Sequence, residues 1–196
     1  EFPALGQVFT EGSHFYSYDH NTELGRRFHS NTWLDRYRFM KGFPVMATEV
    51  YNELGYTPSH ERVLKGFREF AKQKYGTLDE ACKVWNQKFE SWDAVRPPHL
   101  STDIFSGGQA HGQRVAMRQK YWQIYYDWMR YLQLDLMAGL KLMKEDFRKI
   151  SDTPFTIDWR GHTGEADGYC ILDPDMLNEL VDVFGLHTGA YSYDFK

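Results

Sequence analysis

Cysteine is scarce in this sequence, since Cys82 and Cys170 are the only two among 196 residues. Two cysteines so far apart cannot form the disulfide framework of a small secreted domain, and no C-x-x-C spacing indicates a zinc or redox centre. We expect two reduced thiols rather than a bridge between them. Long apolar runs are missing too, which predicts no membrane-spanning segment and no membrane partner.

An excess of positive charge is also missing. The 23 Lys and Arg residues face 27 Asp and Glu, and the net charge of −4 predicts no basic surface for nucleic acid. No charged-then-apolar leader opens the sequence, but its first residues, E-F-P-A-L-G-Q, resemble the middle of a protein, so the compartment stays open, with a cytoplasmic location only as a working expectation. Aromatic residues, by contrast, make up 17% of the chain. Their rings can serve a core, an interface or a sugar site, and composition does not choose among these.

Hydrophobic periodicity and turn residues predict alternating helices and short strands. Helices are expected at about 22–40, with Asn21 or Asp19 as the N-cap, then over 60–75, 77–85, 112–149 and 174–180. Strand-forming runs occur at 45–51, 153–158 and 181–186. A long connection separates the third helix from the fourth. This alternation favours an α/β fold with parallel strands and crossover helices.

The longest predicted helix carries a stripe of large apolar side chains. They recur by threes and fours, apart from the first step of seven, and predict a buried face. The stripe consists of Val115, Trp122, Tyr125, Met129, Leu132, Leu136, Leu140, Met143 and Phe147.

The tripeptide Asn-Glu-Leu occurs twice, so it is no signal by itself. Asn178-Glu179 lies within a predicted helix, where the carboxylate is expected to face solvent. Asn52-Glu53 instead follows a predicted strand and precedes Gly55. In parallel α/β folds, ligands and catalytic residues gather at the carboxyl ends of the strands. Position therefore makes Glu53 the candidate catalytic carboxylate.

A series of motifs follows Asn52-Glu53 at regular intervals. This series resembles glycoside hydrolases of the family-42 β-galactosidase type, which belong to a large clan of retaining glycosidases with a (β/α)₈ barrel. The matching residues are Phe67, Phe70, Tyr75-Gly76-Thr77-Leu78, Trp85, Phe89, Trp92-Asp93 and Pro97-Pro98.

The resemblance implies a partial TIM barrel covering roughly strands 4 to 6, with residues 1–196 as the central part of one catalytic domain, incomplete at both ends. It implies that Glu53 is the general acid/base and that Asn52 binds the sugar. The nucleophile would be a Glu ending the seventh strand, and no Glu follows Glu179. We therefore expect the isolated chain to be inactive.

Other expectations concern the substrate site and the ligands. Trp159, His187 and Tyr191 follow predicted strands and are candidate substrate-binding residues. Family members often carry zinc-binding cysteines after Asn-Glu, whereas this chain has Thr57-Pro58-Ser59-His60, so no zinc and no other cofactor is expected. The partner is a carbohydrate, and a homo-oligomer of the complete enzyme is an expectation from the family.

Two alternatives remain open at this point. One is another clan member that acts on galactose-containing polysaccharide, as an agarase does. The other is a catalytically silent barrel that binds carbohydrate through its aromatic residues.

Overall fold

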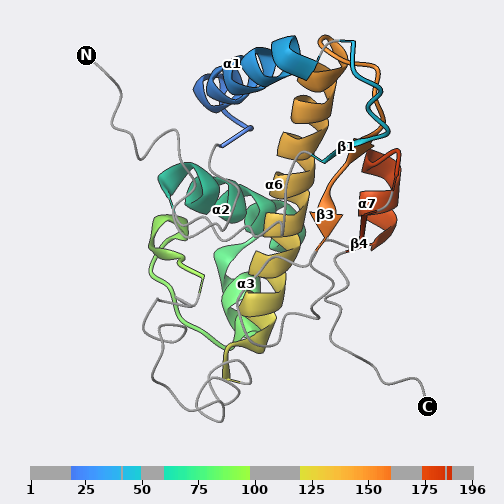
Figure 1. The fold of residues 1–196 in the computed structure, drawn as a ribbon. Coiled ribbons are helices and arrows are strands. Elements are labelled where there is room, and N and C mark those ends of the chain that lie inside the picture. The colour runs from blue at the N-terminus through green and yellow to red at the C-terminus, as the bar shows by residue number, and fades with distance from the viewer. Residues whose placement is uncertain are drawn as a thin grey trace, which may run out of the picture.

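The computed structural model describes residues 19–40, 42–49, 60–97, 120–159, 174–183 and 185–186. Helix α6 runs through the middle of the molecule, with α1 across one of its ends (Figure 1). In this view α2 and α3 lie on one side of α6, and the strands and α7 lie on the other. In chain order the elements are α1 (Glu23–Met40), β1 (Thr48–Glu49), α2 (Glu61–Tyr75), α3 (Leu78–Trp85), the 3-10 helix η2 (Trp92–Ala94), α6 (Trp122–Arg148), β2 (Phe155–Thr156), β3 (Asp158–Trp159), α7 (Pro174–Leu180) and β4 (Gly185–Leu186).

The strands are short and parallel. β1 pairs with β2, with Thr48 opposite Phe155, and β3 pairs with β4, with Asp158 opposite Gly185. Because β2 and β3 are separated only by Ile157, the extended segment 155–159 has β1 beside its first half and β4 beside its second half. The predicted parallel α/β arrangement is therefore confirmed for the described residues.

The third strand is shorter than the predicted run 181–186. Asp182 donates its backbone N–H to the carbonyl of Phe155 at 2.9 Å, and its carboxylate accepts from the backbone N–H of Phe155 at 2.7 Å. Lys144 and Arg148 of α6 also bind this carboxylate. These contacts hold 181–183 as a turn against the start of β2, so that β4 begins only at Gly185.

Local capping explains several helix ends. The predicted Thr77 cap is confirmed, since its hydroxyl accepts from the backbone N–H of Glu80 at 3.3 Å. Gly76 ends α2 with φ of 74°, a left-handed conformation that favours glycine. At α1, however, the cap is Thr22, whose Oγ1 accepts from the N–H of Gly25 at 3.1 Å. The prediction of Asn21 or Asp19 for that role was wrong.

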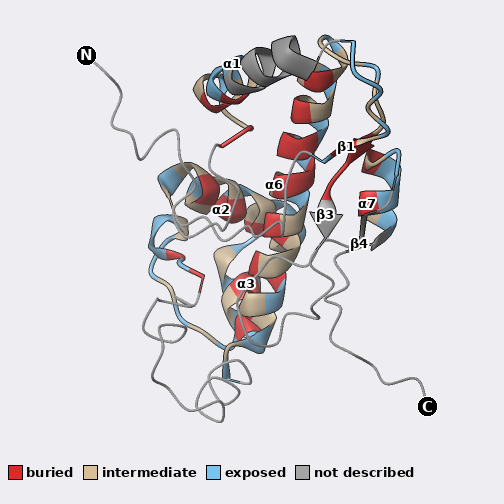
Figure 2. Cartoon of the chain, in the orientation of Figure 1, coloured by how far each residue is buried: buried red, intermediate tan, exposed pale blue. Residues whose placement is uncertain are grey.

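The buried stripe of α6 forms the centre of the core (Figure 2). Leu132, Leu136 and Leu140 are fully buried, and Met143 and Phe147 nearly so, as predicted. Trp122 does not belong to the stripe, because 55% of its surface is exposed, and Tyr125 and Met129 are only partly buried. In this half of α6 the buried apolar side chains are Ile124, Trp128 and Tyr131, so the prediction was wrong there. The described helix starts at Trp122, and the predicted first turns at 112–119 lie outside the described residues.

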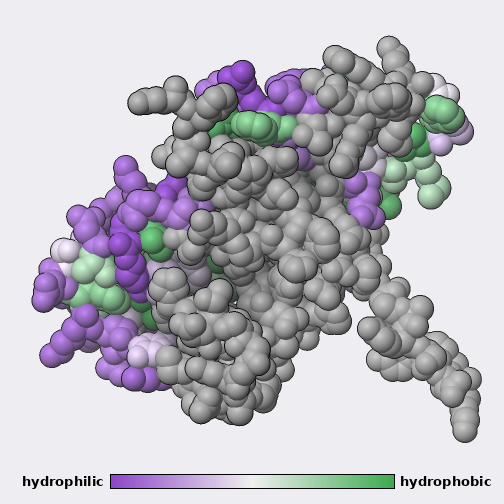
Figure 3. Space-filling view, turned by 60° about the vertical axis from the view of Figure 1, so that its left-hand side comes forward, coloured by the Kyte–Doolittle hydropathy of each residue, from purple (hydrophilic) through white to green (hydrophobic). Residues whose placement is uncertain are grey.

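The outer surface of the described part is mixed. In Figure 3, hydrophilic groups cover most of the coloured surface, and hydrophobic groups form smaller areas between them. No helix in the described ranges is long and apolar enough to cross a membrane.

Candidate functional site

The candidate site residues follow the three parallel strand segments. Since β1, β3 and β4 run in one direction, the chain leaves all of them at the same edge. Asn52 and Glu53 come three and four residues after the end of β1 at Glu49. Trp159 is the last residue of β3, and His187 comes directly after β4. The segments that carry the candidates therefore start from one edge of the strands.

The structure does not describe the side chains of these candidate residues. Asn52, Glu53, His187 and Tyr191 lie outside the described residues, and for Trp159 only its place in β3 is described. Glu179, in the second copy of Asn-Glu, is exposed on α7. This confirms the prediction that its carboxylate faces solvent from a helix.

The two faces of β2 have different surroundings. Phe155 is fully buried and packs edge-on against Phe147 of α6, with ring centroids 5.5 Å apart. Because side chains alternate along a strand, Thr156 lies on the opposite face. Its Oγ1 is buried and has no hydrogen-bond partner among the described residues. Phe155 thus packs against α6, whereas Thr156 places a polar group on the opposite face of β2.

The register of β1 against the next strand is fixed by local contacts. The backbone N–H of Thr48 donates to the carbonyl of Pro154 at 2.8 Å, and its hydroxyl lies 2.8 Å from that of Thr153. The chain thus enters the segment with Asn52 and Glu53 from a strand with a defined position.

The family motif residues form an aromatic cluster. Phe67 stacks on Trp85 with centroids 6.1 Å apart and also contacts Phe70. Trp85 in turn packs edge-on against Tyr75 and Phe89. These residues hold α2, α3 and the following segment together. Among the described residues, the aromatic side chains of the family motif therefore serve to pack α2 and α3 together.

A buried carboxylate that the sequence did not indicate joins this cluster to α6. Asp127, 2% exposed, accepts from Lys74 Nζ at 2.5 Å, from the Tyr75 hydroxyl at 2.5 Å and from Trp85 Nε1 at 2.9 Å. Burial, together with the hydrogen bond to this carboxylate, raises the pKa of Tyr75. Burial alone would lower the pKa of Lys74, but the same carboxylate raises it. Asp127 therefore binds three charged or polar partners at the junction of α2, α3 and α6.

The segment after α3 also packs against the hydrophobic core. Trp92 in η2 is half-buried against the core, and Val95 and Pro97 are buried. No group of three or more His, Cys, Asp or Glu side chains gathers as metal ligands within the ranges that the structure describes.

Comparison with known protein families identifies the family of this chain. The family model for glycoside hydrolase family 42, described as beta-galactosidase, matches residues 17–184. The chain belongs to this family. A search of curated proteins found no match.

Solved structures show the same fold at low sequence identity. The beta-galactosidase from Bacillus circulans sp. alkalophilus matches with a TM-score of 0.60 and 21% identity over 92% of this chain and 25% of its own. The exo-carrageenase from Bacteroides ovatus matches with a TM-score of 0.62 and 17% identity, with the same coverage. The catalytic domain of the beta-amylase from Paenibacillus polymyxa matches with 0.53 and 12% identity, over 94% of this chain and 53% of its own. The chain thus spans about a quarter of the length of the family-42 structures.

Proposed function

We propose that this chain is the central part of a retaining β-galactosidase and covers roughly strands 4 to 6 of a (β/α)₈ barrel. The observation that carries the proposal is the position of Asn52-Glu53 three and four residues after the end of β1, within a family match that spans residues 17–184. The parallel pairing of β1, β2–β3 and β4 agrees with consecutive barrel strands. In such a barrel, catalytic residues stand at the carboxyl ends of the strands.

The proposed mechanism uses two carboxyl groups about 5–5.5 Å apart. The first, a Glu supplied by sequence outside this chain, attacks the anomeric carbon while the Glu53 carboxyl gives its proton to the departing oxygen. A covalent glycosyl-enzyme results. Water then attacks the same carbon, its proton passes to the Glu53 carboxylate, and the nucleophile leaves as a free carboxylate. No cofactor or zinc takes part in this proposed mechanism.

The remaining candidates have roles in binding. Asn52 would hydrogen-bond the sugar hydroxyl next to the reacting carbon, where the interaction strengthens in the transition state. Trp159 would offer a ring for a sugar face to stack on, and His187 and Tyr191 would line the site after β4. The partner is a carbohydrate, and the complete enzyme is proposed to form a homo-oligomer.

Galactose-containing polysaccharide is the second substrate class. The observation that favours it is the likeness to a family-42 structure described as an exo-carrageenase. Comparing kcat/KM for aryl β-galactosides with that for galactan oligosaccharides separates the two classes.

The variant Glu53→Ala tests the proposal in the enzyme expressed from its complete gene. General acid catalysis contributes about 10²–10⁴-fold, so kcat/KM should fall by that order on β-galactosides with poor leaving groups. On dinitrophenyl β-galactoside, whose leaving group needs no proton, glycosyl transfer should be largely retained. Glu179→Ala, an exposed carboxylate in the twin motif, is the matched control and should leave both rates unchanged. Equal activity of Glu53→Ala and the parent enzyme would refute the assignment.

A further inference from the structure

Two aromatic rings lie exposed side by side at the start of α6. Trp122 is 55% exposed and Tyr126 is 59% exposed. The two residues are four positions apart, so they lie on neighbouring turns of the same helix surface. Their ring centroids are 6.2 Å apart, and the ring planes are tilted by 58°. We call this pair the aromatic platform.

The first ring of the platform points to the strand side of α6. Trp122 and Phe147 are about seven helical turns apart, so their side chains leave the helix in nearly the same direction. Phe147 packs edge-on against Phe155 of β2. Trp122 therefore points toward the side of α6 on which the strands lie, but it is exposed there.

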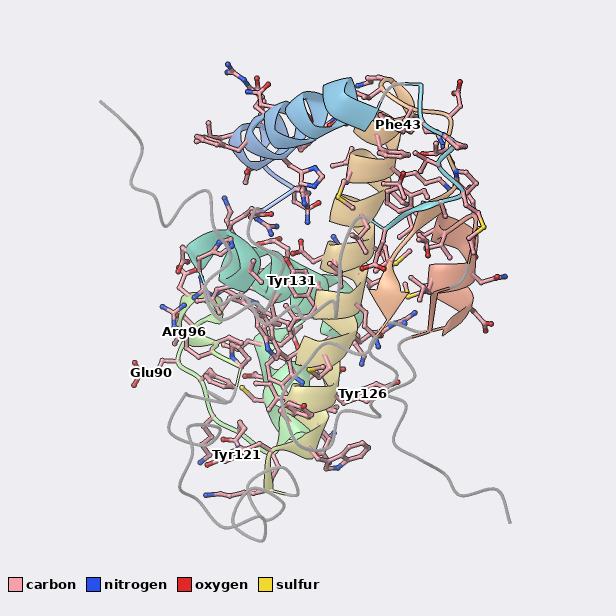
Figure 4. All side chains as sticks on the ribbon, in the orientation of Figure 1. Phe43, Glu90, Arg96, Tyr121, Tyr126 and Tyr131 are labelled. Carbon is pink, nitrogen blue, oxygen red and sulfur yellow. The ribbon has the colours of Figure 1, made fainter. Side chains whose placement is uncertain are left out.

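The second ring lies on the flank of α6 next to α7. Tyr126 is one turn from Arg130, whose Nη1 lies 3.6 Å from Met176 Sδ of α7. In Figure 4, Tyr126 projects from α6 on the side where β3 and β4 lie. Both rings of the platform are therefore directed away from α2 and α3.

The platform stands beyond the carboxyl edge of the strands. The last turn of α6 lies beside the start of β2, where Arg148 Nη1 donates to the Thr153 carbonyl at 2.6 Å. From there the segment 155–159 extends about 13 Å, whereas α6 extends back about 32–38 Å to Tyr126 and Trp122. The strands point toward this end of α6 (Figure 1). The platform is therefore about 20 Å past the edge from which the segments with the candidate site residues start.

This position and this chemistry fit a sugar chain. The chain belongs to a glycoside hydrolase family. Sugar rings stack their C–H faces on aromatic rings, and the Tyr126 hydroxyl adds a polar group at the rim of the platform. At this distance from the strand edge, a ligand bound there would have to be several sugar units long to reach the platform. A disaccharide at the edge would be too short.

We propose that Trp122 and Tyr126 bind a galactose-containing polysaccharide, several sugar units away from the bond that is cleaved. This inference rests on the proposed function and deepens it, because it selects the polysaccharide from the two substrate classes.

The test compares substitutions that remove the rings with substitutions that keep them, in the enzyme expressed from its complete gene. Trp122→Leu with Tyr126→Leu keeps two apolar side chains but no ring, whereas Trp122→Phe with Tyr126→Phe keeps both rings. For soluble β-1,4-galactan, we expect the leucine pair to raise KM about five- to tenfold with kcat nearly unchanged. The phenylalanine pair should keep most of the affinity. For β-1,4-galactobiose, which is too short to reach the platform, KM should stay the same in both.

Leu134→Ala is the matched control, because Leu134 is an apolar side chain, 39% exposed, on another face of α6. It should leave KM for galactan unchanged. An equal rise of KM for galactan and galactobiose would overturn the proposal, because the rings would then support the structure of the enzyme. The same would follow if the leucine and phenylalanine pairs behaved alike, or if neither changed KM.

A binding measurement separates this inference from the proposed function. Retardation of the complete enzyme in a gel that contains β-1,4-galactan needs no turnover, so it can be measured in the Glu53→Ala background. Loss of retardation with the leucine pair, in an enzyme that hydrolyses no β-galactoside, would support the platform and contradict only the proposed function. Retardation that the leucine pair leaves unchanged would overturn the platform.

Discussion

His20 is a titratable side chain that is shut off from solvent. It is fully buried in the turn before α1, and its ring meets that of His29 edge-on with centroids 4.5 Å apart. Burial, and then the charge of the neighbouring His29, hold the pKa of His20 well below its ordinary value of 6.5. The folded chain therefore binds a proton at this site less readily than the unfolded chain does.

This difference predicts a pH dependence of stability. Above pH 6.5 His20 is neutral in both states and the folded state carries no penalty. As the pH falls below 6.5, His20 becomes protonated in the unfolded state but stays neutral in the folded state. The free energy of unfolding should therefore decrease. Urea unfolding of the parent chain and of His20→Asn between pH 7.5 and 5 measures this, and the variant should show the shallower decline.

The carboxylates of Asp146 and Asp182 should not contribute to the decline in stability between pH 7.5 and 5. The pKa of Asp146 and that of Asp182 are lowered from 3.8. For both, burial acts in the opposite direction and is outweighed by hydrogen bonds, so the stability they contribute is lost only in more acidic solution. A decline equally steep in His20→Asn would show that another group is responsible.

At the scale of the elements, α2 and α6 pack closely because of a glycine. A Cβ atom at Gly66 would lie 1.9 Å from the Tyr131 hydroxyl oxygen and 2.8 Å from the ring carbon that bears it. Tyr131, labelled in Figure 4, is 8% exposed and sits where the two helices meet. Its ring contacts Phe67 and Phe70, so it cannot swing away freely. Burial, followed by the charge of Asp135, raises the pKa of Tyr131, so the hydroxyl stays neutral.

Gly66→Ala should therefore destabilise the chain. Alanine favours a helix over glycine by about 1 kcal/mol, but overpacking of a core typically costs about 1–3 kcal/mol, and we expect the clash to win. Thermal or urea unfolding measures the change. Lys65→Ala, at the next position and exposed, should be nearly neutral.

A double variant tests the stated cause. Adding Tyr131→Phe removes the oxygen that the new Cβ would meet first, so Gly66→Ala in that background should cost less than in the parent chain. An equal or greater stability of the single variant Gly66→Ala would show that the helices separate easily and that the glycine is not required.

At the scale of the whole molecule, the chain corresponds to about a quarter of the family-42 structures that it resembles. The proposed mechanism requires a second carboxylate from elsewhere in the enzyme. We predict that the purified 196-residue chain does not hydrolyse aryl β-galactosides, whereas the enzyme from the complete gene does. Turnover by the purified chain that is lost in Glu53→Ala would contradict the assignment of the nucleophile to sequence outside it.

Much of the fold could be predicted from the sequence because its signals are local. The Thr77 cap, the stop at Gly76 and the start of α7 at Pro174 each depend on neighbouring residues, and each is confirmed. The exposed position of Trp122 was missed because aromatic residues lie on several sides of the first half of α6, and packing buries Ile124, Trp128 and Tyr131 there instead. The strand at 181–186 was overestimated because the carboxylate of Asp182 binds the distant Phe155.

The sequence by itself determined the family and the candidate acid/base, because the spacing between Asn52-Glu53 and the later motifs can be read directly from the order of residues. Only the tertiary structure revealed the Asp127 network and the ion pairs of Arg62 with Asp19 and Asp135. Their partners stand 42 to 73 residues apart, and no local pattern links residues at such separations. Local propensity thus specified where helices begin and end, while burial and long-range charge pairing decided which polar side chains hold them together.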